Sequence, residues 1–214
     1  FSIVTFTGNG SNAGTVPHGL GVAPEMVIYK RRNNGASNWV NWVTVIDGGD
    51  DYLSLNTTGA AASLSGVGSI TSSFISNAAY GSEPMLAYCF ASKPGFSKIG
   101  VYTGNGNADG PFVNTGFKPA LVIRKRATTV ADWFVNDAKI NPINSSASGT
   151  GLANISLWAN LTSADEASGE IAYGLDILSN GFKTTTSRNY LNYGNDVYLY
   201  MAFAEAPFKY ANAR

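Results

Sequence analysis

The chain has 214 residues, with 14 Lys or Arg and 14 Asp or Glu, so its formal net charge is zero. Nucleic-acid-binding proteins usually carry a basic excess, so DNA and RNA are not expected partners. No apolar run approaches the roughly 20 residues of a membrane-spanning helix, so membrane insertion is not expected either. Charged residues make up 13% of the chain and glycine is abundant, a composition typical of extracellular β-proteins and virion parts.

Strand signals dominate the first half. Gly, Ser, Thr and Asn interrupt each window before a helical period develops, whereas short runs rich in β-branched and aromatic residues predict strands. The predicted strands of this half are residues 2–7, 25–31, 39–46, 52–55, 69–75 and 85–91. The last run is apolar throughout, as expected for a strand buried on both faces. It contains Cys89, the only cysteine, which is predicted to be a small buried hydrophobe.

The second half repeats the order of the first. Its predicted strands are residues 98–103, 120–126, 132–135, 155–159, 182–186 and 197–204. Asn180-Gly181 precedes one of them and favours a type I′ hairpin turn, because both residues accept positive φ. Each half therefore contains the same series of short strands.

Phrases of the sequence recur as well. Thr-Phe-Thr-Gly-Asn-Gly at residues 5–10 returns as Val-Tyr-Thr-Gly-Asn-Gly at 101–106, roughly 95 residues later. Towards the C-terminal end the offset grows to about 113, which predicts an extra loop near residues 141–154 in the second half only. The Gly-x-Gly phrases are interpreted as turns, since their spacing differs from the dinucleotide-binding fingerprint and no helix follows.

These patterns predict an all-β fold: a β-sandwich built from two sequence-related β-repeats with internal pseudo-twofold symmetry. The first repeat is expected over residues 1–97 and the second over 98–214. Two sheets, each apolar on one face, bury those faces by packing on each other, so the repeats are expected to form one compact domain.

Several longer phrases resemble a domain of unknown function found in bacteriophage proteins, above all those of marine and cyanobacterial phages. The phrases are GLGVAPEM (19–26), ASKPGFSK (91–98), YTGNGNADGPF (102–112), GFKPA (116–120), SNGFK (179–183) and FAEAPFKYANAR (203–214). The likeness spans nearly the whole chain. In its relatives this domain commonly forms the C-terminal part of large virion proteins, sometimes after a lectin-like domain. The family has no established catalytic residues, so none is carried over.

The resemblance implies a non-enzymatic module of the extracellular phage particle. A tail-fibre or other appendage domain that recognises a host-surface glycan is the first expectation. The alternative is a capsid decoration or fibre-assembly protein that contacts other virion chains. A remote alternative is a polysaccharide-degrading enzyme, which requires two carboxylates about 5–9.5 Å apart. Phage fibres are usually trimers, so family analogy implies a homo-oligomer.

Basic residues recur at the ends of two predicted strands. Lys30 and Arg31 end the predicted strand of the first half and Arg32 follows it, and Arg124, Lys125 and Arg126 belong to its counterpart in the second. Together they predict a two-lobed basic patch for an anionic polysaccharide or another virion protein. The alternative is that charged strand ends keep the sheet edges soluble and unpaired.

Two of the four tryptophans are candidates for sugar stacking, because aromatic faces provide contact area at low entropic cost. Trp42 and Trp133 fall in matching predicted strands and are expected in the core. Trp39 and Trp158 have less regular neighbours and are the surface candidates.

Metal and cofactor signals are weak. Asp47, Asp50 and Asp51 bring three carboxylates to one short segment, but calcium needs six to eight oxygen ligands and the order of an EF-hand loop is missing. A solvated turn is the simpler interpretation. His18 is the only histidine and is interpreted as a turn residue. No cofactor is expected.

Overall fold

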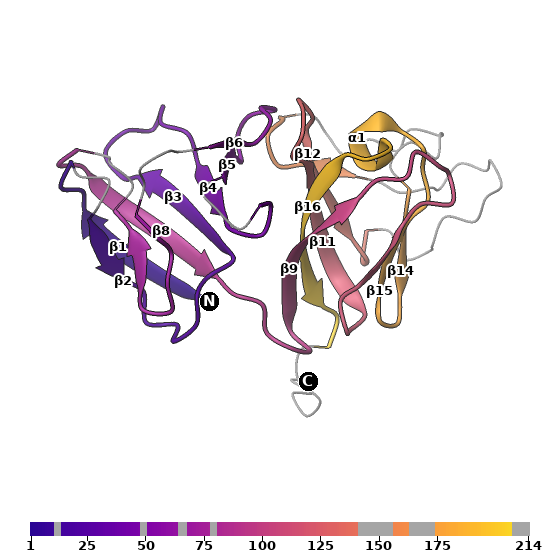
Figure 1. Ribbon diagram of the computed structural model, residues 1–214, viewed down its shortest axis with the longest axis horizontal. Coiled ribbons are helices and arrows are strands. Elements are labelled where there is room, and N and C mark those ends of the chain that lie inside the picture. Colours follow the sequence, from indigo (N-terminus) through magenta and orange to yellow (C-terminus); the bar gives the residue numbers. More distant parts are fainter. Residues whose placement is uncertain are drawn as a thin grey trace. The chain divides into compact units, whose positions relative to one another are not determined.

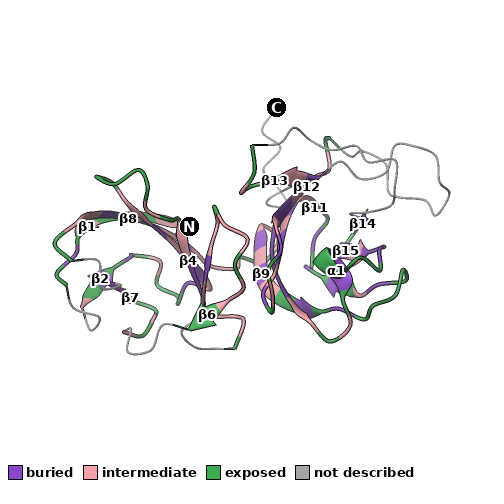
Figure 2. Cartoon of the chain, turned by 90° about the horizontal axis from the view of Figure 1, so that it is seen from above, coloured by how far each residue is buried: buried purple, intermediate pink, exposed green. Residues whose placement is uncertain are grey.

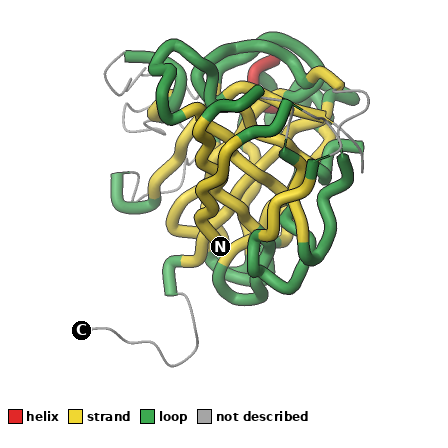
Figure 3. Tube along the Cα trace, turned by 90° about the vertical axis from the view of Figure 1, so that its left-hand side faces the viewer, coloured by secondary structure: helices red, strands yellow, loops and turns green. Residues whose placement is uncertain are grey.

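The computed structural model of the protein describes residues 1–10, 14–47, 51–63, 68–77, 81–140, 156–162 and 174–206. Within these ranges almost all regular structure is strand, and the one helix is α1 (Asn189–Asn192). Figure 3 shows this dominance of strands. The predicted all-β fold class is therefore confirmed. None of the described residues belongs to a helix with the length and apolarity needed to cross a membrane.

The chain divides into two compact units, Phe1–Ser92 and Lys93–Arg214. The main sheet of the first unit is antiparallel and has the order β1-β8-β3-β4-β5-β6. Its strands are β1 (Ser2–Thr7), β3 (Met26–Arg31), β4 (Val40–Val43), β5 (Asp51–Ser54), β6 (Ala62–Ser63) and β8 (Pro84–Phe90). A smaller sheet pairs β2 (Thr15–Pro17) with β7 (Phe74–Ser76). Figure 1 shows β1, β8, β3 and β4 side by side.

The core of the first unit lies between these two sheets. Successive residues of a strand point to opposite faces, and in β8 the residues Met85, Ala87 and Cys89 are buried. They share one hydrophobic cluster with Val16 of β2 and Ile75 of β7. The first unit is thus a small β-sandwich, and the prediction that Cys89 is a buried hydrophobe is confirmed.

The second unit is built in the same way. Its main sheet has the order β13-β12-β11-β16-β9 and its smaller sheet the order β10-β15-β14. The strands are β9 (Ser97–Thr103), β10 (Phe112–Asn114), β11 (Pro119–Arg126), β12 (Trp133–Asp137), β13 (Leu157–Trp158), β14 (Leu175–Leu178), β15 (Gly181–Thr184) and β16 (Val197–Ala204). In Figure 2, β14, β15 and α1 lie on the same side of β11.

The second unit also has its own core. Tyr198, Tyr200 and Ala202 of β16 share a hydrophobic cluster with Val113 of β10 and Phe182 of β15. Tyr102 of β9 joins this cluster and stacks on Tyr198, with ring centroids 4.9 Å apart and an interplanar angle of 10°. Tyr102, the aromatic residue of the repeated phrase, is therefore a core residue of this unit.

The compact units and the described hydrophobic clusters each lie within one half of the chain. The units divide between Ser92 and Lys93, before the predicted boundary at residue 97. The two described hydrophobic clusters are each drawn from a single unit. A sandwich therefore forms within each half, because each half contributes a second, smaller sheet beside its main sheet. The extra loop predicted near residues 141–154 lies outside the described residues.

The two main sheets share one strand order. In each unit the first strand pairs with the last, the last pairs with the third, and the third pairs with the fourth. The registers correspond too: Lys30 lies opposite Leu86 in β8, and Lys125 lies opposite Leu199 in β16. The matching basic residues are therefore Lys30 with Lys125 and Arg31 with Arg126.

The repeated Thr-Gly-Asn-Gly phrase forms a turn in the second unit. Gly106 has a φ of 70°, a left-handed conformation that favours glycine. A Cβ on Gly104 would lie 2.1 Å from the backbone oxygen of Tyr193, so only glycine fits there. The buried side chain of Asn192 in α1 accepts from the Asn105 N–H at 2.8 Å and fixes the turn. The interpretation of these glycines as turn residues is confirmed here.

Candidate functional site

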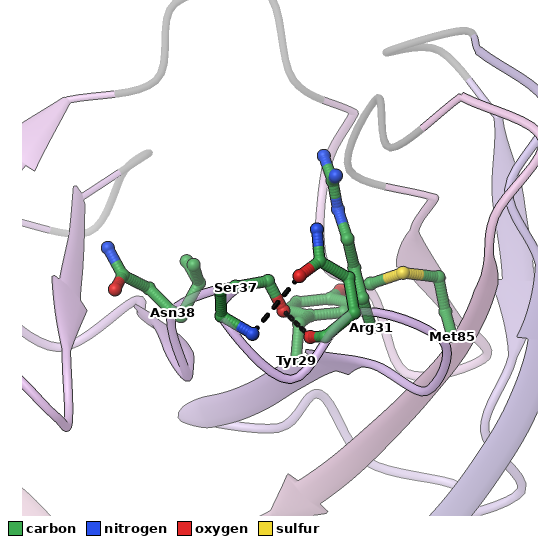
Figure 4. Close-up of a pocket in the computed structure, with 8 residues that line it drawn as sticks. Tyr29, Arg31, Ser37, Asn38 and Met85 are labelled. Atoms are coloured by element: carbon green, nitrogen blue, oxygen red, sulfur yellow. Dashed lines mark hydrogen bonds between the residues drawn. The ribbon is translucent and has the colours of Figure 1, made fainter.

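A pocket of about 390 Å³ opens in the first unit, where β3 ends and the chain turns into the segment that leads to β4. This volume is at the small end of the range found for ligand pockets. Its lining combines apolar, amide, hydroxyl and cationic side chains: Tyr29, Arg31, Asn34, Ala36, Ser37, Asn38, Val40 and Met85. In Figure 4, Asn38 and Met85 lie at opposite ends of the pocket.

The strand residues of the pocket come from one face of the main sheet. Tyr29 and Arg31 are two positions apart in β3 and so point to the same face, and Arg31 lies opposite Met85 in the register. The Tyr29 hydroxyl donates to the backbone oxygen of Ser76 at 2.9 Å, which holds the ring in place. The pocket thus continues the core face of the sheet beyond β2 and β7.

The loop of the pocket, residues 33–38, is organised by Lys30. Its Nζ donates to the backbone oxygens of Asn34 at 3.4 Å and Gly35 at 3.2 Å, and to that of Ser37. The Asn34 side chain accepts from the Ala36 N–H at 3.1 Å, as in an Asx turn. One ammonium group therefore gathers three carbonyl groups and shapes the loop. The sequence placed Lys30 in a basic patch; the structure gives it this positioning role.

The predicted stacking residue Trp39 lies directly after this loop. Its ring centroid is 5.5 Å from the Lys30 Nζ, a cation–π contact. The ring stacks on Tyr88, with centroids 6.4 Å apart and an interplanar angle of 23°. Asn56 orients the segment, since it accepts from the Trp39 N–H at 2.9 Å and donates to Asn38 Oδ1 at 3.1 Å. The half-buried Trp39 is thus held through its ring by Lys30 and Tyr88 and through its backbone by Asn56.

The two basic residues predicted in the first unit have different environments. Arg31 is half-buried in the pocket, and Figure 4 shows its side chain extending away from the strand. Arg32 is exposed, and its backbone N–H donates to the oxygen of Pro84 at 2.8 Å. Only Arg31 therefore lines the pocket.

The structure corrects the expectation that Arg124 belongs to a surface patch. Its side chain is fully buried, and it donates to Asn136 Oδ1 at 3.0 Å and lies 3.5 Å from Thr184 Oγ1. Burial lowers the pKa of the guanidinium below its ordinary value, and the nearby Tyr102 acts in the opposite direction. Arg124 matches Tyr29 in the register, so its position is a core position in both units.

Arg126 and Lys125 also have interaction partners within the second unit. The Arg126 guanidinium forms an ion pair with Asp196 and lies 5.0 Å from the ring centroid of Tyr193. The Lys125 ammonium donates to the backbone oxygen of Arg126 at 2.6 Å. Burial lowers the pKa of Lys125 to about 8, although Asp132 acts against the shift. The two-lobed basic patch is therefore reduced to Arg31 and Arg32 of the first unit.

The remaining tryptophans divide largely as predicted. Trp42 and Trp133 are both 1% exposed, which confirms them as core residues. Trp158 is half-buried in β13, and its ring lies 6.4 Å from that of Phe134. It belongs to the second unit, whereas Trp39 belongs to the first.

The acidic segment is divided between a strand and a turn. Asp51 begins β5, is 9% exposed, and accepts from the Ser63 hydroxyl at 2.7 Å, which ties β5 to β6. Asp47 is exposed, and Asp50 lies outside the described residues. His18 is buried: its Nε2 donates to the oxygen of Thr71 at 3.0 Å. Among the residues described, no three His, Cys, Asp or Glu side chains form a group able to hold a metal ion.

Sequence reasoning missed most of the pocket. The Asn-Asn-Gly-Ala-Ser-Asn composition of residues 33–38 indicates a loop, but no pattern places Tyr29 and Met85 beside it. Their proximity depends on the pairing of β3 with β8, which are separated by more than fifty residues of chain.

A family model for a domain of unknown function, DUF7483, matches residues 1–207. The chain belongs to this family. No curated protein and no solved structure matches it. The DUF7483 domain therefore includes both units and the pocket of the first.

Proposed function

We propose that this DUF7483 chain is a non-enzymatic bacteriophage virion module, of the tail-fibre or appendage kind, that binds a host-surface glycan through its first unit. One observation carries the proposal: a single short segment contributes polar groups to a pocket and presents Trp39 directly after it. The resemblance of the sequence phrases to phage virion domains supports the biological setting.

The chemistry of the site suits a sugar. Sugars present hydroxyl groups at their edges and apolar C–H groups on their faces, so they need both hydrogen-bonding and apolar surfaces. Asn34, Ser37 and Asn38 supply amide and hydroxyl groups, and Tyr29 and Met85 supply an aromatic and a thioether surface. Ligand sites in proteins commonly combine an apolar lining with a few placed polar groups.

The proposal also gives the two units different roles. The common strand order and the equal registers support an origin by duplication of one β-unit. In the second unit, the residues that match the pocket residues Arg31 and Met85 are Arg126 and Tyr198. Arg126 pairs with Asp196, and the Tyr198 hydroxyl donates to the oxygen of Asn189 in α1 at 2.8 Å. We assign ligand binding to the first unit because the pocket and Trp39 both belong to it.

The test is a glycan array probed with the purified chain. Host capsular, lipopolysaccharide and exopolysaccharide fractions are immobilised, and bound protein is detected. The proposal expects saturable binding to at least one fraction without release of reducing ends. An array that stays silent across the surface polysaccharides of the host would overturn it, and release of reducing ends would indicate an enzyme instead.

A second candidate function is a contact with other virion chains. Phe1 and Ile3 are 62% and 57% exposed. The Phe1 ring lies 4.8 Å from that of Phe90, and Ile3 lies opposite Tyr88 in the register, so they form one apolar patch. Exposed apolar patches often mark protein interfaces. Light scattering of the wild type and of an Ile3→Ser variant tests this candidate, which expects a homo-oligomer that the substitution dissociates.

A further inference from the structure

One edge of the first unit's main sheet is formed by β1, which pairs with β8 on one side. Among the residues that the structure describes, no strand pairs with its other side. β1 has six residues, and its register with β8 runs from Ser2 to Thr7 without a shift. A long, regular edge strand presents a row of backbone N–H and C=O groups to which another strand can pair. The open side of β1 is therefore a candidate surface for strand pairing.

The open side of β1 carries the backbone groups of Ile3, Thr5 and Thr7. Gly8, the next residue of the chain, donates its N–H to the backbone oxygen of Glu83 at 2.8 Å, so its backbone faces β8. In an antiparallel pair, successive residues direct their N–H and C=O groups alternately to the partner strand and away from it. Every second residue counted back from Gly8 thus faces β8, and the three residues between them face away.

The other described edge strands have features that limit pairing. Natural sheets protect their edges by keeping the edge strands short or by placing charged residues in them. β6 and β13 have two residues each, β2, β7 and β10 have three, and β14 has four, with Asp176 among them. β9 has seven residues but contains Lys98. β1, with the sequence Ser-Ile-Val-Thr-Phe-Thr, is long and has no charged residue.

Both faces of β1 retain apolar surface that a further strand would cover. On the outer face, Phe1 and Ile3 are 62% and 57% exposed. On the opposite face, Val4 and Phe6 pack against the core of the first unit but are only half-buried. Burial of apolar surface is favourable, so it would stabilise a strand pair at this edge in addition to the backbone hydrogen bonds.

We propose that the open side of β1 pairs antiparallel with β1 of a second copy of this chain. A twofold axis at Thr5 places Thr5 opposite Thr5 and Ile3 opposite Thr7, so each of these residues gains a partner for its N–H and its C=O. The same register places Val4 opposite Phe6, and opposite residues of an antiparallel pair share a face. Apolar residues therefore meet on the core face.

A second copy fits this edge because the strand complements itself. An interface around a twofold axis uses the same surface on both chains, and an uncharged strand meets no like charge in its copy. This inference does not depend on glycan binding by the pocket. It gives the second candidate function, a contact between chains, a defined partner and register.

The experiment measures the oligomeric state of the intact chain by analytical ultracentrifugation over a range of concentrations. We expect a reversible dimer. Thr5→Pro should raise its dissociation constant about tenfold or more, or about 1.4 kcal/mol, because the N–H donors at the axis are lost. Proline is tolerated in an edge strand where the N–H faces away from the sheet.

Val101→Pro is the matched control for Thr5→Pro. Val101 holds the corresponding position in β9, since Gly104 donates to the backbone oxygen of Asp196 as Gly8 donates to that of Glu83. The control makes the same change at the open edge of the second unit and should leave the dissociation constant unchanged.

Thr5→Lys is a second variant that keeps the backbone N–H. The Thr5 side chain is exposed, so the first unit should fold, and thermal unfolding checks this. In the dimer the substitution places two ammonium groups opposite each other, and like charges in this arrangement are destabilising. Hydrogen exchange adds a local measurement: the amides of Ile3, Thr5 and Thr7 should be protected in the wild-type dimer and should exchange rapidly in Thr5→Lys.

The outcomes separate this inference from the proposed function. A wild-type chain that stays monomeric overturns the inference. A dimer in which these three amides exchange rapidly, or one that a folded Thr5→Lys leaves intact, also overturns it. A monomer that binds glycan leaves the proposed function in place, whereas a dimer with a silent glycan array overturns the proposed function and supports the pairing of β1.

Discussion

The ammonium of Lys30 lies 5.5 Å from the ring centroid of Trp39 and 3.2 Å from the backbone oxygen of Gly35. One side chain thus connects the loop of the pocket to the aromatic residue that follows it. Lys30 and Tyr29 are neighbours in β3 and point to opposite faces of the sheet. Tyr29 therefore lines the pocket from one face of β3, and Lys30 shapes the pocket loop from the other face.

Lys30→Met should loosen this loop. The substitution keeps an unbranched apolar side chain but removes the ammonium that three carbonyl groups share, at a cost of about 1–2 kcal/mol in the free energy of unfolding. Hydrogen exchange should accelerate at the amides of residues 34–37. Lys98→Met is the control, since the Lys98 Nζ donates to the single backbone oxygen of Asn114 at 3.1 Å. Unchanged exchange in Lys30→Met would contradict the organising role.

Asn136→Ala should destabilise the second unit strongly. The substitution removes the side-chain oxygen that accepts from the buried Arg124 guanidinium. Loss of one partner of a buried charge costs about 3–5 kcal/mol, because the charge stays buried with less compensation. Urea denaturation measures the effect.

The double variant Arg124→Leu/Asn136→Leu is the matched comparison. It removes the charge and its partner together, and apolar replacement of a buried polar pair is often close to neutral. We expect the double variant to be more stable than Asn136→Ala. A double variant that is less stable than the single one would show that Arg124 contributes more than its desolvation costs.

Lys125 should make stability depend on pH. Its pKa is lowered to about 8 in the folded chain, mainly by burial. Between this value and the ordinary pKa of about 10.4, the unfolded chain binds more protons than the folded one. The free energy of unfolding therefore rises with pH in this window.

The comparison with Lys125→Met isolates this contribution. The free energy of unfolding of the wild type relative to this variant should rise by about 1–3 kcal/mol between pH 7 and pH 10. Urea denaturation at both pH values measures it, and Lys98→Met serves as the control. Parallel pH profiles of the wild type and Lys125→Met would show that the Lys125 ammonium is not buried in solution.

Cys89 should be unreactive in the folded chain. Its side chain lies in the core of the first unit, and burial raises the pKa of the thiol to about 11. The thiolate is the reactive form, so modification by a thiol reagent should proceed only as the unit unfolds. The rate should rise steeply in urea. Rapid and complete modification of the native chain would contradict the position of Cys89.

Much of the fold could be predicted from local patterns. The apolar run at residues 85–91 and its counterpart at 197–204 predict strands next to the core, and both are central strands of their sheets. In the smaller sheets, β7 and β15 overlap the predicted strands 69–75 and 182–186, whereas β2 and β10, with three residues each, were not predicted. Such short segments carry too little periodicity to distinguish a strand from a loop.

The candidate site shows why two similar runs of basic residues have different environments in the two units. Lys30-Arg31-Arg32 and Arg124-Lys125-Arg126 look equivalent, yet the registers align them one residue apart. Because side chains alternate between the faces of a strand, this shift places Arg124 on the core face, which it shares with Arg31, whereas Lys30, the first residue of the other run, lies on the opposite face. Sequence composition reveals the charges, and only the pairing of the strands decides which face each charge occupies.

The most direct test of glycan recognition by the first unit is the affinity of the intact chain for purified host-surface polysaccharide, measured by calorimetry with Trp39→Ala and Trp158→Ala. Both variants remove a half-buried tryptophan, but only Trp39 adjoins the pocket loop. The proposed role predicts that Trp39→Ala lowers the affinity about tenfold or more, because a lost stacking contact costs about 1–3 kcal/mol. It predicts no change in affinity for Trp158→Ala. Undiminished binding by a folded Trp39→Ala, or a larger loss in Trp158→Ala, would contradict it.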